Sequence, residues 1–260
     1  MHLEHAELER LNDAEARALL QRRPVVLLPV GAVEAHGDHL PAGTDNYLAR
    51  RLSAALVERI AGATPVMLLP LLPFGQVWSL SDAPGSFSIS NETVSRMVTE
   101  IGLSMLEKGL SSLAVINTHY GNATALREAQ RQLKDKGLTV AILNYPGAAQ
   151  TTAAVREKPA AHSSYMHACE IETSYMLHLA PELVRMDKAI VNYPEFPPDF
   201  GEVAYRWSEF SASPVLGDAA AATSEKGRII LEAVINRMAE LVADLYSRQA
   251  GSRSMQETSS

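Results

Sequence analysis

Short apolar runs alternate with longer amphipathic segments along this chain of 260 residues. Residues 24–30, 64–74, 112–117 and 138–145 are apolar at most consecutive positions, which is typical of strands covered on both faces. The segments between them repeat apolar residues every three or four positions, the period of an α-helix. Strands that alternate with helices predict an α/β fold with a mostly parallel central sheet flanked by helices.

The helical period recurs at residues 46–62, 91–108, about 123–136, about 168–179 and about 222–247. In the first of these helices, leucines at 48, 52 and 56 stand four positions apart, and Gly62 follows as a typical terminator. We expect a single domain over 1–247, followed by a polar flexible tail over 248–260. A long irregular stretch near 191–217 is typical of a functional or oligomer-forming insertion.

Charge and composition narrow the class of protein. The formal net charge is -7, from 23 basic and 30 acidic residues, which argues against a nucleic-acid-binding surface. No apolar run approaches the roughly 20 residues that span a bilayer, and the charged N-terminus lacks the apolar core of a signal peptide. The single cysteine, Cys169, excludes an intrachain disulfide. We therefore expect a cytoplasmic protein with no nucleic-acid partner and no membrane association.

Ionisable side chains gather directly after the first predicted strand, in the stretch VGAVEAHGDHLPAGTDN at residues 30–46. Glu34 and His36 stand two apart in an extended segment and so point to the same side, and Asp45 returns after a loop rich in Gly and Pro. Ligands of open α/β sheets bind beyond the carboxyl ends of the strands, which is where this stretch is predicted to lie.

Two further stretches carry residues of the same kind. NTHYGN follows the strand at 112–117 and contributes His119, while HACEIETS contributes His167 and Glu170, three apart on one face of a predicted helix. Any one of these residues alone is typical of a helix cap or a solvated side chain. Together, the histidines suit zinc or iron, and the carboxylates extend the choice to manganese. The ligands exceed the need of one structural zinc and favour two ions about 3.5–4 Å apart, bridged by a carboxylate.

Four stretches together resemble the signature motifs of a known family. GAVEAHGDHLPAGTD, NTHYGN and HACEIETS resemble three motifs of the creatininase (creatinine amidohydrolase) family, and GDAAAATSEKG at residues 217–227 is similar to its C-terminal signature. The motifs extend from residue 31 to 227, so the resemblance covers nearly the whole chain. It implies a creatininase-like fold, two divalent metal ions (zinc first, manganese or iron as alternatives) and a homo-oligomer, hexameric by resemblance.

The resemblance also implies a set of metal ligands. Creatininase itself has a glutamate ligand two residues beyond the histidine of the second motif, where this chain has Gly121. The chain resembles instead a branch in which a glutamate of the third motif, here Glu170, binds the second metal. The other implied ligands are Glu34 and His119 on one metal, His36 on the other, and Asp45 as the bridge.

The same motifs imply catalytic and substrate-binding residues. His167 matches the family's proton donor to the leaving nitrogen, and Glu172 matches the glutamate that accompanies it. The activity implied is hydrolysis of a C–N bond in a linear or cyclic amide by a metal-activated water. Creatininase carries tryptophans ahead of its catalytic histidine, and residues 145–166 contain none, so we expect a member other than creatininase proper. The residues implied in substrate binding are Tyr120, Trp78, Gly121 and Asn122, the last also a candidate helix cap.

Three alternatives stay open. A mononuclear non-haem iron enzyme would use His36, Asp45 and His119 as a triad of two histidines and one carboxylate. A non-catalytic metal-binding protein would have closed metal sites and no open cleft. A formamide deformylase or peptidase of the same family would keep the metal site and change the substrate.

Overall fold

The structure, a computed structural model, describes residues 3–257 around a four-stranded parallel sheet. On one side of β1, Leu27 pairs with Leu68, and on the other side it pairs with Ala114. The chain leaves β1 toward β2 and leaves β3 toward β4, in opposite directions, so the loops after β1 and β3 separate. α/β proteins bind ligands at such a point of the sheet. The strands, in the spatial order β2-β1-β3-β4, are β1 (Val25–Val30), β2 (Val66–Leu68), β3 (Ser112–Asn117) and β4 (Thr139–Leu143).

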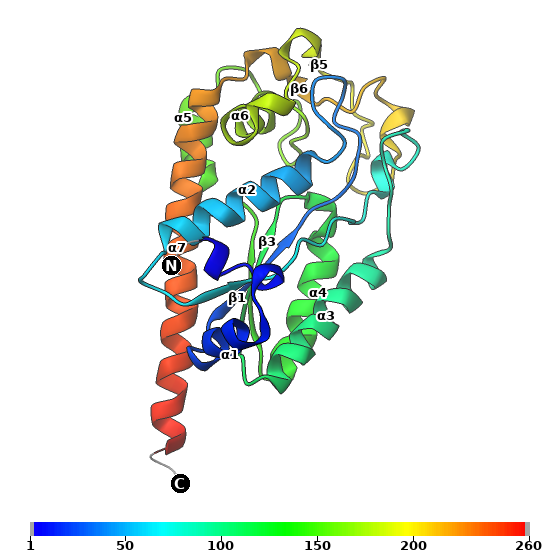
Figure 1. The fold of residues 1–260 in the computed structure, drawn as a ribbon. Coiled ribbons are helices and arrows are strands. Elements are labelled where there is room, and N and C mark those ends of the chain that lie inside the picture. Colours follow the sequence, from blue (N-terminus) through cyan, green and yellow to red (C-terminus); the bar gives the residue numbers. More distant parts are fainter. Residues whose placement is uncertain (1–2, 258–260) are drawn as a thin grey trace.

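Helices cover both faces of the sheet, with α2 and α7 on one side and α3 and α4 on the other (Figure 1). None of the helices within residues 3–257 is both long and apolar enough to cross a membrane. The α-helices are α1 (Asp13–Gln21), α2 (Thr44–Arg59), α3 (Asn91–Glu107), α4 (Ala123–Asp135), α5 (Ala148–Val155), α6 (Glu170–Leu179) and α7 (Ser224–Glu257).

Alternate residues of the central strands enter two separate apolar cores. On β1, Val25 and Leu27 pack with the core formed by α2, α6 and α7. The intervening Val26 and Leu28 pack with the core formed by α1, α3 and α4. Since both faces are buried, the strands need apolar residues at consecutive positions, which explains the apolar runs of the sequence.

The α/β fold with a parallel sheet is confirmed, and most predicted element boundaries lie within two residues of the observed ones. The stretch 64–74 forms a strand only over Val66–Leu68, because Pro70 and Pro73 lack the N–H that a sheet requires. The sequence predicts an end of the last helix near 247 and a flexible tail after it, but α7 continues to Glu257. Residues 248–257 are rich in good helix formers, and the rest of the predicted tail lies outside the described residues.

The irregular insertion leaves and rejoins the domain through a short antiparallel ribbon, β5 (Val191–Asn192) paired with β6 (Gly217–Asp218). Trp207, in the middle of the insertion, is buried in a small apolar cluster with Val77 and Leu216. The insertion therefore packs against the loops that follow the strands, where the candidate site lies.

Helices α6 and α7 approach each other closely at Gly227. A Cβ built at this position would lie 2.0 Å from the carbonyl oxygen of Ser174 on α6. A backbone oxygen cannot move aside as a flexible side chain does, so the crossing of the two helices requires glycine here.

We predict that Gly227→Ala lowers the free energy of unfolding by about 2–3 kcal/mol, the upper part of the range for overpacking. Gly43→Ala is the matched control, because a Cβ there would meet the Tyr47 ring at an ordinary 3.4 Å. Gly43 is the N-cap residue of α2, so the control should cost less than about 1 kcal/mol, the usual effect of losing a glycine cap. Urea denaturation measures both variants, and equal losses would contradict the steric explanation.

Candidate metal centre and active-site pocket

Six ionisable side chains from four segments meet beyond the carboxyl ends of β1 and β3. Each of them is at most 6% exposed. Burial of so many charged groups is costly unless they are paired or bind a cation. They are Glu34 and His36 after β1, Asp45 in the first turn of α2, His119 after β3, His167 before α6 and Glu172 in its first turn.

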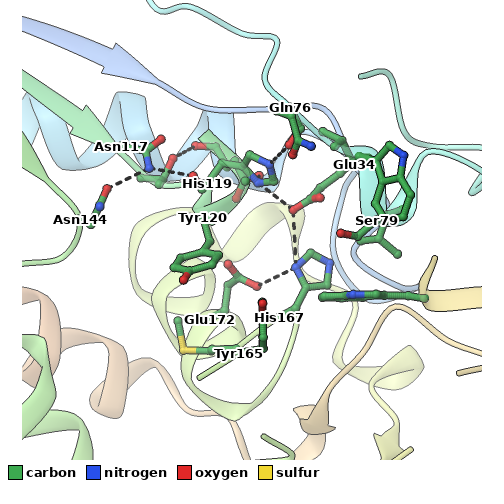
Figure 2. A pocket seen from close by; sticks show the side chains of 18 of the residues that line it. Glu34, Gln76, Ser79, Asn117, His119, Tyr120, Asn144, Tyr165, His167 and Glu172 are labelled. Atoms are coloured by element: carbon green, nitrogen blue, oxygen red, sulfur yellow. Dashed lines mark hydrogen bonds and ion pairs between the residues drawn. The ribbon is translucent and has the colours of Figure 1, made fainter. Parts of the chain in front are cut away.

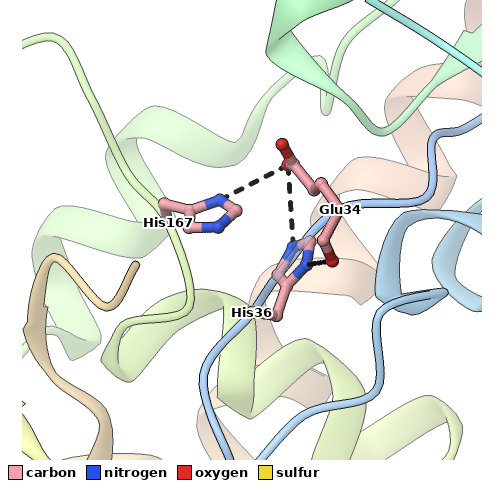
Figure 3. Close-up of side chains that lie close together, drawn as sticks. All are labelled: Glu34, His36 and His167. Atoms are coloured by element: carbon pink, nitrogen blue, oxygen red, sulfur yellow. Dashed lines mark hydrogen bonds and ion pairs between the residues drawn. The ribbon is translucent and has the colours of Figure 1, made fainter. Parts of the chain in front are cut away.

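Each of the three histidines has one ring nitrogen bonded to a backbone carbonyl oxygen. Because a carbonyl only accepts, we assign the hydrogen to that nitrogen. The other nitrogen then faces the carboxylates, as Figure 2 shows for His119 and His167 and Figure 3 for His36. This second bond is the usual way in which proteins orient a metal-binding histidine. The three bonds are His36 Nδ1 to Glu34 O at 3.1 Å, His119 Nε2 to Gln76 O at 2.7 Å and His167 Nε2 to Ala35 O at 2.9 Å.

Asp45 lies between two histidines and turns one oxygen to each. Its Oδ1 is 3.7 Å from His36 Nε2, and its Oδ2 is 3.1 Å from His119 Nδ1. Glu34 Oε1 is 3.0 Å from the same His119 nitrogen, and Glu172 Oε2 is 3.7 Å from His36 Nε2. Two groups of close ligand atoms therefore share Asp45: one with Glu34 and His119, the other with His36 and Glu172.

Glu34 also joins these groups to His167. Its Oε1 is 3.9 Å from His36 Nε2 and 3.5 Å from His167 Nδ1, so one carboxylate oxygen faces both rings (Figure 3). The rings of His36 and His167 themselves are in contact, with centroids 4.2 Å apart. His167 is thus held beside the cluster without entering the two groups that share Asp45.

The donor atoms fit divalent cations. His36 Nε2 is buried and has no hydrogen-bond partner among the described residues, and Asp45 Oδ2 faces His119 without hydrogen-bond geometry. Buried polar atoms in this state are rare unless a water or an ion completes them. Imidazole and carboxylate together are the ligands of zinc, manganese and iron in proteins.

The charges of the cluster alter its protonation. Burial raises the pKa of the Glu34 carboxyl, but the histidines, His119 first, outweigh burial and hold that pKa well below its usual range. Burial lowers the pKa of His119, but Glu34 and then Asp45 raise it well above its usual value. Burial raises the pKa of Glu172 to about 7. Without a cation the site therefore holds protons at neutral pH, and a bound metal would replace them.

Glu170, the ligand predicted for the second metal, does not reach this cluster. Its carboxylate accepts hydrogen bonds from the backbone N–H groups of Glu157 and Lys158, at 2.9 and 3.0 Å. It also pairs with Nζ of the buried Lys226 at 2.8 Å. The structure thus corrects the prediction: Glu172 faces the metal-binding groups in its place.

The backbone just before α6 determines where the two glutamates of this helix lie. The sequence predicts a helix from residue 168, which would place His167 and Glu170 on one face. Ala168 instead has a left-handed φ of 49°, and α6 begins only at Glu170, so helical spacing does not relate these two residues. The Ala168 N–H donates to Glu172 Oε2 at 2.5 Å, which turns Glu172 toward His167.

Gly121 stands where a side chain cannot fit. A Cβ there would lie 2.2 Å from the carbonyl oxygen of Gln76 and 2.4 Å from His119 Nε2. These are the two atoms of the hydrogen bond that orients His119. A glutamate at this position is therefore incompatible with the observed backbone.

A pocket of about 370 Å³ opens over the cluster. Trp78, Tyr120 and Gly121, all predicted to bind substrate, line it. Asn122 does not: it is fully buried, its Nδ2 donates to Gly31 O, and its Oδ1 accepts from the N–H of Gln76. Its side chain does not cap α4 either.

The sequence does not predict several of the residues that line the pocket. Gln76, Tyr165 and Trp207 line the pocket, and none is a typical metal ligand. Gln76 and Tyr165 come from irregular segments, and Trp207 begins a short 3-10 helix in the insertion. The length of the insertion that carries Trp207 was the only signal for that residue. Two other ionisable residues of the stretch 30–46 lie outside the cluster: Asp38 is exposed, and His39 Nε2 contacts Thr173 Oγ1 at 2.9 Å.

A buried cluster of histidines and carboxylates under an open pocket, at the carboxyl edge of a parallel sheet, is typical of a metal-dependent hydrolase. Residues 9–242 match the creatininase family, described as creatinine amidohydrolase. The chain belongs to this family of metal-dependent amidohydrolases, which confirms the family and the class of enzyme predicted from its motifs.

The relatives cover nearly the whole chain and differ in the substrates that their names give. The mycofactocin precursor peptide peptidase of Mycobacterium ulcerans (strain Agy99) is 30% identical over 250 residues, 94% of this chain and 91% of that protein. The creatinine amidohydrolase of Pseudomonas putida is 27% identical over 237 residues, covering 85% and 90%. A solved structure of a mutant creatininase, described as Zn-Zn type, has a TM-score of 0.79 at 26% identity and covers 93% of this chain and 98% of that chain.

We predict that Lys226→Met destabilises the protein by about 3 kcal/mol, because it leaves the Glu170 charge buried without its cation. This is the lower end of the usual range, since two backbone N–H groups still bond Glu170. Lys136→Met, at an exposed lysine, should change the free energy of unfolding by less than about 0.5 kcal/mol. Urea denaturation of the metal-free proteins measures both, and a neutral Lys226→Met would contradict a structural role for the pair.

Proposed function

We propose that this protein is an amidohydrolase with two divalent metal ions. One ion would be held by Glu34, Asp45 and His119, and the other by His36, Asp45 and Glu172. The observation that carries the proposal is the orientation of Asp45, whose two oxygens face two different histidines. A carboxylate shared in this way is the usual bridge of a two-metal site.

Zinc is the ion that we favour, with manganese or iron as alternatives. The ligands are histidine nitrogens and carboxylate oxygens, which all three metals accept. The description of the related creatininase structure as Zn-Zn type supports zinc and a count of two.

The mononuclear iron alternative receives less support. Within residues 3–257, no group of mutually close ligand atoms combines His36, Asp45 and His119. A single ion bound by that triad would also leave Glu34 and Glu172 buried beside it without a function.

In the proposed reaction, the metal ions, His167 and Glu172 would have different roles. When bound, the two ions supply a Lewis acid for the amide carbonyl and lower the pKa of a water from about 15.7 toward 7. His167 Nδ1, 3.5 Å from Glu34 and 4.0 Å from Glu172, is placed to pass a proton to the leaving nitrogen. Its bond from Nε2 to Ala35 O keeps the ring in this orientation. Glu172, predicted as a catalytic residue, is proposed here as a ligand.

The pocket favours a small amide. Its volume of about 370 Å³ is at the low end for small-molecule sites. Aromatic rings of Trp78, Tyr165 and Trp207 form much of its wall, and these flat faces suit a planar group such as an amide or lactam. Among the described lining residues there is no lysine or arginine, so only the proposed metal ions would attract an anionic part of the substrate.

A peptide is the second candidate substrate. A groove of about 930 Å³ between α3 and α4 shares Tyr120 and Asn144 with the pocket. It offers space for a chain extending from the scissile amide, and the name of the mycobacterial relative agrees with such a substrate.

We predict that Glu172→Gln binds about one equivalent of zinc per chain, whereas the wild type and Glu170→Gln bind about two. The reason is that Glu172 faces the cluster and Glu170 faces Lys226. Elemental analysis of zinc-loaded, desalted protein measures the content, and thermal unfolding checks that each variant folds. Glu172→Gln should also lose more than about 100-fold in activity, since loss of a mere supporting residue costs 10–100-fold. Loss of zinc from Glu170→Gln alone would reverse the assignment.

We predict that the zinc-loaded protein hydrolyses a small lactam, formamide or dipeptide amide from a panel of such compounds. If the groove binds peptides, extending the best substrate by four residues should raise kcat/KM about 10-fold, equal to about 1.4 kcal/mol of added binding. Thr124→Trp, an exposed position in the groove but not in the pocket, should abolish that gain and leave the short substrate unaffected. No gain from extension would rule out the peptide candidate.

A further inference from the structure

Asn122 carries a fully buried amide to which the proposed function gives no role. Its side chain joins three segments of the chain. Its Oδ1 accepts from the backbone N–H of Gln76 at 3.0 Å, and its Nδ2 donates to the backbone oxygen of Gly31 at 3.0 Å. Nδ2 also donates to Oδ1 of Asn117, at the end of β3, at 3.2 Å. These bonds tie the end of β3 to the loops that follow β1 and β2.

The orientation of this amide is fixed by its two backbone partners. The N–H of Gln76 only donates and the oxygen of Gly31 only accepts, so the oxygen and the nitrogen of Asn122 cannot be exchanged. Asn117 must therefore turn its Oδ1 to Asn122 and its Nδ2 the other way. That Nδ2 donates to the backbone oxygen of His119 at 2.7 Å (Figure 2). Each of these bonds thus has only one possible direction.

The bonds form a closed ring that begins and ends at His119. The His119 ring donates from Nε2 to the oxygen of Gln76, whose N–H donates to Asn122. Asn122 donates to Asn117, and Asn117 donates to the backbone oxygen of His119. His119 is therefore held by its side chain and by its backbone. The three side chains are at most 6% exposed, and a buried network with its bonds satisfied is rigid.

The loop after β2 has a glycine where the amide of Asn122 enters. A Cβ at Gly75 would lie 2.5 Å from Asn122 Oδ1 and 2.9 Å from the backbone oxygen of Gly31. Any other residue at position 75 would therefore displace the amide or separate the two loops that it joins. The chain provides both the amide and the space for it.

Building on the proposed two-metal site, we propose that Asn122 is a positioning residue for the metal ligand His119. It fixes the peptide of Gln76, whose oxygen accepts the His119 Nε2–H, and through the ring of bonds it fixes the His119 backbone. Nδ1 of His119 then faces Glu34 and Asp45, at 3.0 and 3.1 Å. Asn122 itself lies outside both groups of close ligand atoms and outside the pocket, so it acts on the metal only through His119.

The test measures the affinity of the one ion that His119 would bind. Glu172→Gln serves as the parent protein, because it is expected to keep only that ion. In this parent, Asn122→Ala should bind zinc about 10–100-fold more weakly, the usual effect of losing a group that orients a metal ligand. Competition with a coloured zinc chelator measures the affinity, and thermal unfolding checks that each variant folds.

Asn192→Ala, in the same parent, is the matched control. The Asn192 side chain also donates from Nδ2 to two oxygens, those of Ser211 Oγ and the Val215 backbone, but it lies in the ribbon that begins the insertion. Its loss should lower stability and leave the zinc affinity within about 2-fold of the parent, since distant sites act independently.

Hydrogen exchange gives a second measurement that does not depend on zinc affinity. In the zinc-saturated proteins, NMR follows the Nε2–H proton of His119, which the ring of bonds protects from water. This proton should exchange about 10-fold faster in Asn122→Ala than in Asn192→Ala, because local opening becomes easier.

Three results would overturn the proposal. They are a zinc affinity in Asn122→Ala equal to that of the parent, an equal loss in Asn192→Ala, and the same exchange rate in both variants. If Asn122→Ala does not fold, Asn117→Ala replaces it, because it removes the bond to the His119 backbone and should show the same losses. A Glu172→Gln parent that binds no zinc refutes the proposed metal site first, and the role of Asn122 with it.

Discussion

The buried carboxylate of Asp45 is the group on which the site depends. It is 1% exposed and packs beside two further buried carboxylates, Glu34 and Glu172. Like charges at this distance repel, and each buried ion costs several kcal/mol unless other charges compensate. Without metal, the histidines and bound protons supply that compensation. Two cations would supply it more completely, so metal binding and the stability of this end of the sheet are coupled.

Helix N-termini bring two of these carboxylates to the site and stabilise them. Asp45 lies in the first turn of α2 and Glu172 in the first turn of α6, where the helix dipole favours negative charge. The Thr118 hydroxyl donates to the backbone oxygen of Asp45 at 2.8 Å, which ties the start of α2 to the end of β3. The start of α6 is fixed by the Glu170–Lys226 pair and, further along, by the contact with Gly227.

The sequence predicts the fold and four of the proposed ligands because both depend on patterns among residues close together along the chain. Apolar runs define the buried strands, and Glu34, His36, Asp45 and His119 follow the strands whose ends meet at one edge. Other features depend on contacts that local spacing does not encode. Because of the left-handed turn at residue 168, Glu172 faces the cluster in place of Glu170. The insertion contributes Trp207 to the pocket only through tertiary packing.

One hydrogen bond, between His119 and Gln76, explains both the glycine at position 121 and the use of Glu172 as a proposed ligand. His119 presents Nδ1 to the carboxylates because its Nε2 is bonded to Gln76 O. A side chain at Gly121 would displace that carbonyl oxygen, since a Cβ would lie 2.2 Å from it, and His119 would lose the bond that orients it. In this backbone a ligand at residue 121 and the observed orientation of His119 are mutually exclusive. The carboxylate opposite His36 must therefore come from another segment, and the first turn of α6 supplies it as Glu172.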